Sequence, residues 1–274
     1  MTGMNSSNST SSTVGAGQGT VGAHRPEDPS GRVVAVTGAG SGIGRATARA
    51  FAAAGARVVA VGRRAEPLRE TAAGHDRITA LPLDITDGDA PQRLARAVSG
   101  RYGRLDVLVN NAGIVRGGAL GTLTPELITA QLSTNLVAPV LLTQAALPLL
   151  EASGGVIVNV STSVGQRAWP GNSVYAATKT ALELLTRSWA VELAPRGIRV
   201  VAVAPGAIDT PIGEHQGLTP ERRAAVREWQ LAHTPLGRIG RPGEVAWAIT
   251  QLAAPAASFV TGVVLPVDGG AVVA

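Results

Sequence analysis

Short apolar runs alternate with longer amphipathic stretches along this chain of 274 residues. The apolar runs, many of them β-branched, are typical of strands, and the stretches between them are typical of helices. The predicted strands are Arg32–Thr37, Arg57–Val61, Arg77–Leu81, Leu105–Val109, Val156–Val160, Ile198–Ala204 and Phe259–Val267. The predicted helices cover 45–54, 91–101, 124–151, a segment that carries 175 and stops near 194, 220–232 and 241–253. This alternation predicts an α/β fold with a doubly wound parallel sheet in a single domain.

Residues 1–30 depart from this pattern. They are rich in Ser, Thr, Gly and Asn, and they lack the apolar segment of a signal peptide. Such a composition buries too little surface to offset the entropy lost on ordering, so we expect a disordered or peripheral extension before a domain over 31–274. We expect a cytoplasmic protein. No apolar run reaches the roughly 18 residues that a membrane span needs, so no membrane partner is expected.

Charge and composition narrow the chemistry further. The chain carries 24 Lys and Arg against 19 Asp and Glu, which gives a formal net charge of +5. Because the arginines are spread along the chain, nucleic-acid binding is not expected. The absence of cysteine excludes disulfides and thiol catalysis, and the four histidines are scattered, so no metal site is expected.

A glycine-rich turn follows the first predicted strand. Gly38, Gly42 and Gly44 lie directly between that strand and an amphipathic stretch, with Ser41 and Ile43 beside them. Glycines let the backbone approach a pyrophosphate, which binds at the positive N-terminus of the following helix. A glycine turn alone is a weak signal, but between a strand and a helix it predicts a Rossmann-type dinucleotide site.

The end of the second predicted strand bears on the choice of cofactor. An NAD site usually offers Asp or Glu to the ribose hydroxyls in this position, whereas an NADP site offers arginine to the 2′-phosphate. Here the strand runs into Gly62, Arg63 and Arg64, with no acid. We therefore expect NADP(H), bound through Arg63, with NAD as the alternative. The other possibility is that both arginines are solvated loop residues.

Several more residues follow predicted strands at their carboxyl ends, where doubly wound sheets bind ligands. These are Asp84, Asn111, Gly113, Ser161, Thr162 and Ser163. The three hydroxyl groups could hydrogen-bond a carbonyl, or they could form an ordinary Ser/Thr turn. A polar stretch over about 206–235 is long enough to be a loop that covers the substrate.

The strongest chemical signal is the pair formed by Tyr175 and Lys179. Lys179 is the only lysine of the chain, and it follows one of only two tyrosines by four residues. On a helix these positions share a face, about 5–6 Å apart at Cβ. A cation about 4 Å from the phenolate would lower the tyrosine pKa from ~10 by up to about three units, into the range of a useful acid or base. The alternative is an exposed helical pair worth roughly a few tenths of a kcal/mol.

Together these motifs resemble the short-chain dehydrogenase/reductase family over about residues 31–272. The likeness is nearest to its 3-oxoacyl-carrier-protein-reductase-like members and its sugar or alcohol dehydrogenases. It rests on Thr37-Gly38, Gly42-Ile43-Gly44, Asn110-Asn111-Ala112-Gly113, Asn135, Tyr175, Lys179 and Pro205-Gly206, in a fitting order and spacing. The resemblance implies a seven-stranded parallel sheet, a homotetramer or homodimer, and an oxidoreductase that interconverts a ketone or aldehyde and an alcohol.

The resemblance also implies roles for single residues. Tyr175 would be the general acid/base, and Lys179 would bind the nicotinamide ribose and lower the tyrosine pKa. Asn135 would hold a water molecule where its helix is locally disturbed. Asp84 would lie by the adenine and Asn111 by the adenosine ribose. The other residues expected to bind cofactor are Ile85, Ala112, Gly113, Pro205, Gly206, Ile208 and Thr210, the last two in a segment beside the carboxamide.

One position departs from the family. The family's catalytic hydroxyl belongs to a serine thirteen residues before the tyrosine, and the residue there in this chain is Thr162. Thr162 keeps a hydroxyl that could polarise a carbonyl, while its methyl group could narrow the site. Ser161 and Ser163 are the alternatives. The sequence does not identify the substrate, although the resemblance puts Gln166, Arg167, Trp169 and Pro170 near it.

Three other functions remain open on the sequence alone. The nearest is an NAD(H)-dependent alcohol or sugar dehydrogenase. The scaffold could also serve a non-redox enzyme, such as an epimerase or dehydratase that retains its nucleotide, or a protein that senses the nucleotide without turnover. The set of Tyr175, Lys179 and Asn135 argues against the sensor, so we predict an NADP(H)-dependent enzyme with a small carbonyl or alcohol substrate.

Overall fold

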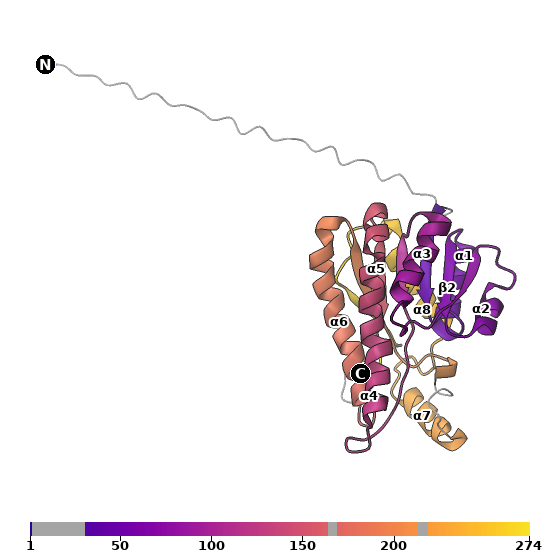
Figure 1. Ribbon diagram of the computed structural model, residues 1–274. Helices are drawn as coiled ribbons and strands as arrows, with labels where there is room; N and C mark the ends of the chain where they lie inside the picture. The colour runs from indigo at the N-terminus through magenta and orange to yellow at the C-terminus, as the bar shows by residue number, and fades with distance from the viewer. Residues whose placement is uncertain (2–30, 164–168, 213–218) are drawn as a thin grey trace.

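A seven-stranded parallel sheet forms the centre of the molecule (Figure 1). It is seen in a computed structural model that describes Met1 and residues 31–163, 169–212 and 219–274. The strands are β1 (Val33–Thr37), β2 (Arg57–Gly62), β3 (Ile78–Pro82), β4 (Val107–Asn110), β5 (Val156–Val160), β6 (Arg199–Pro205) and β7 (Val264–Val267). The predicted α/β fold and parallel sheet are confirmed. The predictions for residues 1–30, for Gln166 and Arg167, and for residues 213–218 of the expected substrate loop lie outside the described residues.

The order of the strands sets the place where a ligand can bind. They lie in the order β3-β2-β1-β4-β5-β6-β7, and every neighbouring pair is parallel. The chain winds outward in one direction from β1 and in the other from β4. Ligands of such sheets bind beyond the carboxyl ends of the strands, where the winding reverses. The carboxyl ends of β1 and β4 therefore mark the site.

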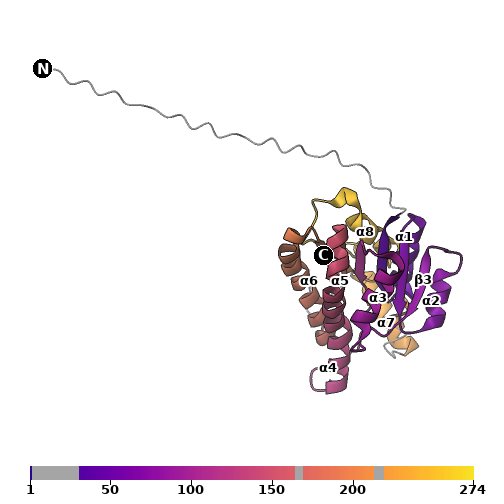
Figure 2. The same cartoon turned by 45° about the horizontal axis from the view of Figure 1, so that its top comes forward.

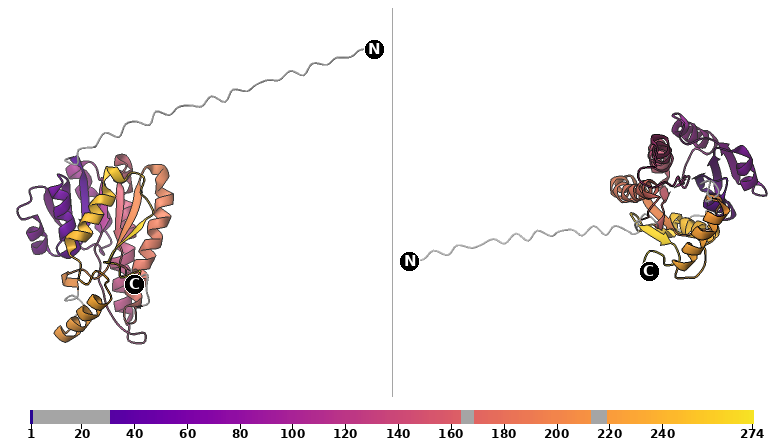
Figure 3. Two further views of the ribbon diagram at one scale, coloured as in Figure 1. Left: turned by 180° about the vertical axis from the view of Figure 1, so that it is seen from behind. Right: turned by 90° about the horizontal axis from the view of Figure 1, so that it is seen from below.

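Helices cover both faces of the sheet. They are α1 (Gly42–Ala53), α2 (Ala65–Ala72), α3 (Ala90–Tyr102), α4 (Pro125–Leu132), α5 (Ala138–Ser153), α6 (Ser173–Leu193), α7 (Pro220–Ala232) and α8 (Pro242–Ala253), with 3₁₀ turns at Ala194–Arg196 and Pro255–Ala257. One core layer joins α1, α2 and α8 to the sheet, and the other joins α3, α5 and α6 to it (Figures 1 and 3). Alternate strand residues such as Val34 and Val33 turn into opposite layers, so the strands are apolar on both sides.

The predicted helix over 124–151 is interrupted. A π-helical turn, Ser133–Val137, separates α4 from α5, and the three segments continue as one long rod (Figure 2). Within the described residues, this stretch, Pro125–Ser153, is the one helix long and apolar enough to cross a membrane by length and composition alone. The core helix of an α/β protein passes the same test, and the inner side chains of α5, such as Leu142 and Leu150, are buried against the sheet.

Two other predictions need correction. The last strand begins at Val264 rather than at Phe259, because Gly262 takes a positive φ of 72° and Thr261 bonds to Val200, which replaces the regular ladder. The helix after Gly44 begins earlier, at Gly42. Helix α2 has no counterpart among the predicted helices, since its buried residues are only Leu68 and Thr71.

Candidate active site

The turn between β1 and α1 consists largely of glycines, which leave its backbone without covering side chains. Gly38 and Gly42 have positive φ values of 66° and 51°, which favour glycine. A Cβ on Gly38 would lie 2.9 Å from the Ala112 Cα, and one on Gly44 would collide with the Gly38 carbonyl oxygen. Ser41 is the N-cap of α1, and its side chain makes no capping hydrogen bond. Open backbone at a helix N-terminus fits the pyrophosphate of a dinucleotide.

Thr37 locks this turn to the end of β4. Its hydroxyl accepts hydrogen bonds from the Asn111 and Ala112 backbone N–H groups, both at 3.0 Å, and donates to the Val109 carbonyl at 3.2 Å. The Asn111 amide donates to the Thr37 carbonyl at 2.7 Å. Asn111 is thereby fixed against the glycine turn at the point where the winding of the sheet reverses.

Exposed cations lie at the predicted adenosine end of the site, and Arg63 is the one beside Asp84. The Arg63 side chain is 69% exposed, and its Nε lies 4.0 Å from the Asp84 carboxylate. The carboxylate of Asp84 also accepts hydrogen bonds from the Thr86 backbone at 3.0 Å and from the Thr86 hydroxyl at 2.8 Å. Ile85, by contrast, buries its side chain in the core layer of α3, α5 and α6.

The four residues predicted to be catalytic are all buried: Tyr175, Lys179, Thr162 and Asn135. The Lys179 ammonium donates to the Val160 carbonyl at 2.8 Å. A Cβ on Gly113 would lie 3.3 Å from the Lys179 Nζ and 3.4 Å from the Asn135 Oδ1, so a side chain here would press on both polar groups. Lys179 and Asn135 therefore flank the same point at the carboxyl end of β4.

The π turn contains Asn135, so the predicted local disturbance of this helix is present. Its Oδ1 accepts from the Ile114 N–H at 2.9 Å, and its Nδ2 donates to the Ile114 carbonyl at 2.9 Å and to the Thr178 hydroxyl at 3.2 Å. These bonds tie the π turn to the chain after β4 and to α6. The water predicted at Asn135 stays a prediction.

Thr162 is the hydroxyl residue that meets Tyr175. The two side chains share a hydrogen bond, and the Thr162 hydroxyl also lies 3.3 Å from the Pro205 carbonyl, to which it donates. Ser161 turns toward α6 instead, where its hydroxyl donates to the Glu183 carboxylate at 2.7 Å. Between these two candidates, the geometry favours Thr162 as the partner of the tyrosine.

Burial dominates the acid–base properties of the pair on α6. It raises the pKa of the Tyr175 phenol to about 12, and the hydrogen bond with Thr162 opposes this shift. Burial also lowers the pKa of the Lys179 ammonium to about 8. The expected lowering of the tyrosine pKa by lysine is therefore not seen in this state, because desolvation of the phenolate outweighs the other influences and the ammonium is bonded to Val160.

The segment after β6 returns to the glycine turn. Gly206 donates its N–H to the Val267 carbonyl at 3.1 Å, and Ile208 forms an isolated bridge with Gly240. A Cβ on Gly42 would lie 3.1 Å from the Thr210 methyl group. The segment predicted to meet the carboxamide thus adjoins the turn predicted to meet the pyrophosphate.

Comparison with known proteins identifies the family to which this geometry belongs. A family model described as enoyl-(acyl carrier protein) reductase matches residues 38–272. The 3-oxoacyl-[acyl-carrier-protein] reductase of Thermotoga maritima is 42% identical over 248 residues, which cover 89% of this chain and 98% of that protein. The chain belongs to the short-chain dehydrogenase/reductase family.

Two further comparisons agree. The cis-4-hydroxycyclohexanecarboxylate dehydrogenase of Sinomonas cyclohexanicum is 44% identical over 246 residues, which cover 87% of this chain and 96% of that one. The solved 3-ketoacyl-(acyl-carrier-protein) reductase of Brucella melitensis, complexed with NADH, matches with a TM-score of 0.82 at 34% identity, over 89% of this chain and 99% of that one. This short-chain dehydrogenase/reductase is therefore an oxidoreductase that acts on carbonyl and alcohol groups, and the predicted family and enzyme class are confirmed.

The expected substrate-binding segments of this short-chain dehydrogenase/reductase are more exposed to solvent than its catalytic residues. Helix α7 lies beyond the end of the sheet, at the same end of the molecule as α4 (Figures 1 and 3), and none of its residues is buried. Its Arg227 lies 3.4 Å from the Asp209 carboxylate, in the segment after β6. Trp169 is half-buried and Pro170 is exposed.

Within the described residues, no group of three or more His, Cys, Asp or Glu side chains could hold a metal.

Proposed function

We propose that this enzyme reversibly reduces a ketone or aldehyde to an alcohol with NADP(H), and that Tyr175 is the general acid/base. The observation that carries the proposal is the buried group of Tyr175, Thr162 and Lys179 at the carboxyl end of β5. The bound cofactor supplies or accepts the hydride, while the residues of this chain orient the substrate and move the proton.

The protonation states suit reduction. Tyr175 holds its proton at neutral pH, because burial raises its pKa to about 12. It donates that proton from its hydroxyl to the oxygen of the substrate as negative charge develops there, and Thr162 hydrogen-bonds to the same oxygen. Lys179, with its pKa lowered to about 8, still carries its charge near pH 7 and stabilises the phenolate that remains.

The choice of NADP(H) rests on the end of β2. The strand ends at Gly62, and the exposed Arg63 follows it where an NAD site would present a carboxylate. The guanidinium of Arg63 would bind the 2′-phosphate through charge-assisted hydrogen bonds. The Brucella melitensis relative is complexed with NADH, so NAD(H) is the alternative that a binding experiment must exclude.

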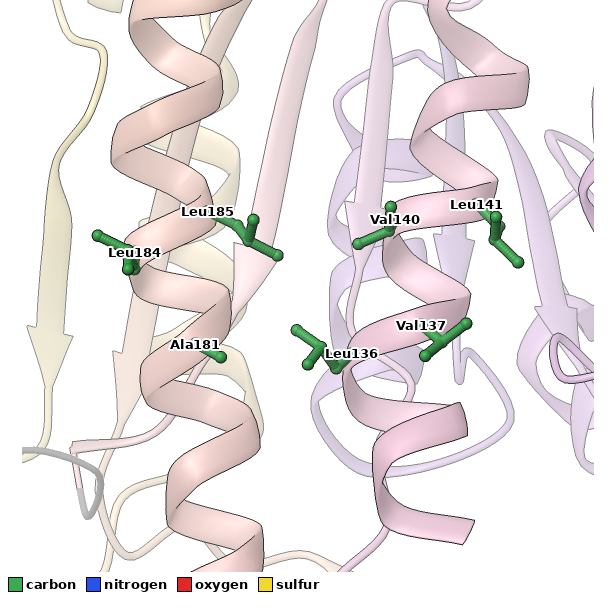
Figure 4. A pocket seen from close by; sticks show the side chains of 7 residues that line it. All are labelled: Leu136, Val137, Val140, Leu141, Ala181, Leu184 and Leu185. Atoms are coloured by element: carbon green, nitrogen blue, oxygen red, sulfur yellow. The ribbon is translucent and has the colours of Figure 1, made fainter. Parts of the chain in front are cut away.

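We also propose that the chain forms a homo-oligomer through the outer face of α5 and α6. An apolar groove runs between the two helices, lined by Leu136, Val137, Val140, Leu141, Ala181, Leu184 and Leu185. Leu185 of α6 points across the gap toward Leu136 and Val140 (Figure 4). Leu141, Leu184 and Val191 are exposed on these helices. A second copy that pairs the same face would cover them and remove apolar surface from water.

Titration of the purified protein with NADPH and NADH, followed by a panel of ketones, aldehydes and alcohols, tests the main proposal. Tighter binding of NADPH and net oxidation of NADPH by at least one carbonyl compound are expected. Tighter binding of NADH would overturn the role of Arg63. A bound cofactor with no turnover on the whole panel would favour a nucleotide-sensing protein instead.

A further inference from the structure

Polar contacts join β5 and the residues after it to α6 in an ordered series, which we call the polar ladder. Its contacts are Asn159 Nδ2 to Thr186 Oγ1 at 2.9 Å, Ser161 Oγ to Glu183 Oε1 at 2.7 Å, Lys179 Nζ to the Val160 carbonyl at 2.8 Å, and the bond between Thr162 and Tyr175. The helical members follow one another at intervals of three or four residues, so they share one face of α6. The two contacts nearest the site involve the residues proposed for catalysis.

Glu183 is the unusual member of the polar ladder. The residue is 3% exposed, and among the described residues the hydrogen bond to its carboxylate comes from the neutral Ser161 hydroxyl rather than from a basic side chain. Burying a carboxylate is costly, and replacing a buried polar group by an apolar one of similar volume is often neutral or stabilising. Stability alone therefore does not account for a carboxylate in this place.

Ser161 connects Glu183 to both parts of the site. Its hydroxyl lies 3.2 Å from the Lys179 carbonyl oxygen as well as 2.7 Å from Glu183, so one side chain contacts both ends of a turn of α6. Its backbone N–H donates to the Val203 carbonyl at 2.8 Å, which fixes it to β6. Because Ser161 directly precedes Thr162, a shift of the Ser161 backbone would displace the Thr162 hydroxyl relative to Tyr175.

We propose that Glu183 and Ser161 form a positioning pair for the reduction. By anchoring α6 to the chain just before Thr162, they set the distance between the Thr162 hydroxyl and the Tyr175 phenol. Neither residue contacts the substrate in this role. The inference rests on the function proposed for Thr162 and Tyr175. It adds Glu183, which the sequence motifs do not include, and gives Ser161 a role other than that of the catalytic hydroxyl.

Substitutions of Glu183 that differ in hydrogen bonding test the pair. Glu183→Gln keeps the length and an acceptor oxygen, whereas Glu183→Met keeps the length and removes the acceptor. With NADPH and the best carbonyl compound of the panel, we expect Glu183→Met to lower kcat roughly ten- to a hundredfold, with the KM for NADPH within about twofold of the wild type. Its Tm should not fall. Glu183→Gln should keep kcat within about threefold.

Two comparisons separate positioning from general damage. Thr186→Val removes the ladder contact farthest from the site, and it should lower Tm while changing kcat less than about twofold. The double variant Thr162→Ala/Glu183→Met should have a kcat within about twofold of that of Thr162→Ala alone. A residue that acts by positioning the Thr162 hydroxyl has no effect once that hydroxyl is absent.

The outcomes are distinct. Equal kcat values for Glu183→Gln and Glu183→Met, or a kcat loss in Glu183→Met that multiplies fully with that of Thr162→Ala, would overturn the positioning pair. The positioning pair would also be overturned if the loss of kcat in Glu183→Met came with a corresponding fall in its Tm. If Thr162→Ala alone leaves kcat unchanged, the function proposed for Thr162 fails. The positioning pair is then overturned as well, because it has no hydroxyl to position. If Thr162→Ala lowers kcat and Glu183→Met does not, only the positioning pair is overturned.

Discussion

Thr162 and Tyr175 share a hydrogen bond across the gap between the end of β5 and α6. The Thr162 hydroxyl also donates a hydrogen bond, at 3.3 Å, to the Pro205 carbonyl at the end of β6. The family's usual serine is therefore replaced by a threonine whose hydroxyl still reaches the tyrosine. Its methyl group adds bulk at the point where we expect the substrate carbonyl to bind.

Replacing Thr162 by alanine should lower kcat by about a hundredfold or more, because it removes one hydrogen bond to the oxygen that gains charge in the transition state. Steady-state reduction of the best carbonyl compound measures this. Ser163→Ala is the matched control and should keep kcat within about threefold. The reverse ranking of these two variants would assign the hydroxyl to Ser163. Thr162→Ser should restore most of the activity, since it keeps the donor and removes only the methyl group.

Replacing Tyr175 by phenylalanine should remove the proton donor while keeping the ring that packs at this position. General acid catalysis contributes typically 10²–10⁴-fold, so we expect kcat to fall on the order of a thousandfold. The Kd for NADPH, measured by quenching of intrinsic fluorescence, should change less than about threefold. Full turnover by Tyr175→Phe would contradict the mechanism.

The pH dependence should report Lys179 rather than Tyr175. The pKa of the Lys179 ammonium is lowered to about 8 by burial, whereas the pKa of the Tyr175 phenol is raised to about 12. As the pH rises through 8, Lys179 loses the charge that stabilises the phenolate, and kcat/KM for reduction should fall about tenfold for each further pH unit. Measurements of kcat/KM with the free enzyme between pH 6 and 10 give this profile. A flat profile up to pH 10 would exclude the lysine charge as a requirement.

Much of the fold and of the site could be predicted because it depends on local patterns. A buried strand, a glycine turn and a helix succeed one another from Val33 to Ala53, and each has its own signature in the sequence. The pair of Tyr175 and Lys179 shares a helix face by spacing alone. The predicted start of the last strand at Phe259 was wrong. The apolar residues before Val264 resemble a strand in sequence, but Gly262 turns the chain there.

Properties that depend on packing could not be predicted in the same way. The pKa of Tyr175 rises because residues distant in the sequence bury it, and the spacing from Lys179 carries no information about that burial. The contact of Ser161 with Glu183 spans 22 residues and exists only because α6 packs on β5. A glutamate on the inward face of an apolar helix was the available signal, since such a residue is rarely buried without a partner.

Assembly through α5 and α6 should be sensitive to charge. Leu184→Glu puts a carboxylate on the exposed apolar face, and it should shift the molar mass in light scattering from an oligomer to the monomer, because a charge buried in the interface would be unpaired. Phe259→Glu, which changes an even more exposed apolar residue away from these helices, is the control and should leave the molar mass unchanged. A wild-type protein that is monomeric at micromolar concentration would refute this surface as an interface.

Replacing Arg63 by alanine should separate the two nicotinamide cofactors. A charge-assisted hydrogen bond contributes about 1.5–3 kcal/mol, so Arg63→Ala should raise the KM for NADPH roughly ten- to a hundredfold. The KM for NADH should change less than about twofold, because NADH has no 2′-phosphate for the guanidinium to bind. Arg64→Ala is the matched control: Arg64 is the exposed N-cap of α2, and its loss should affect NADPH by less than about threefold. Equal losses for both cofactors in Arg63→Ala would mean that this arginine binds a part of the nucleotide common to NADH and NADPH, and the preference for NADP(H) would then lack its physical basis.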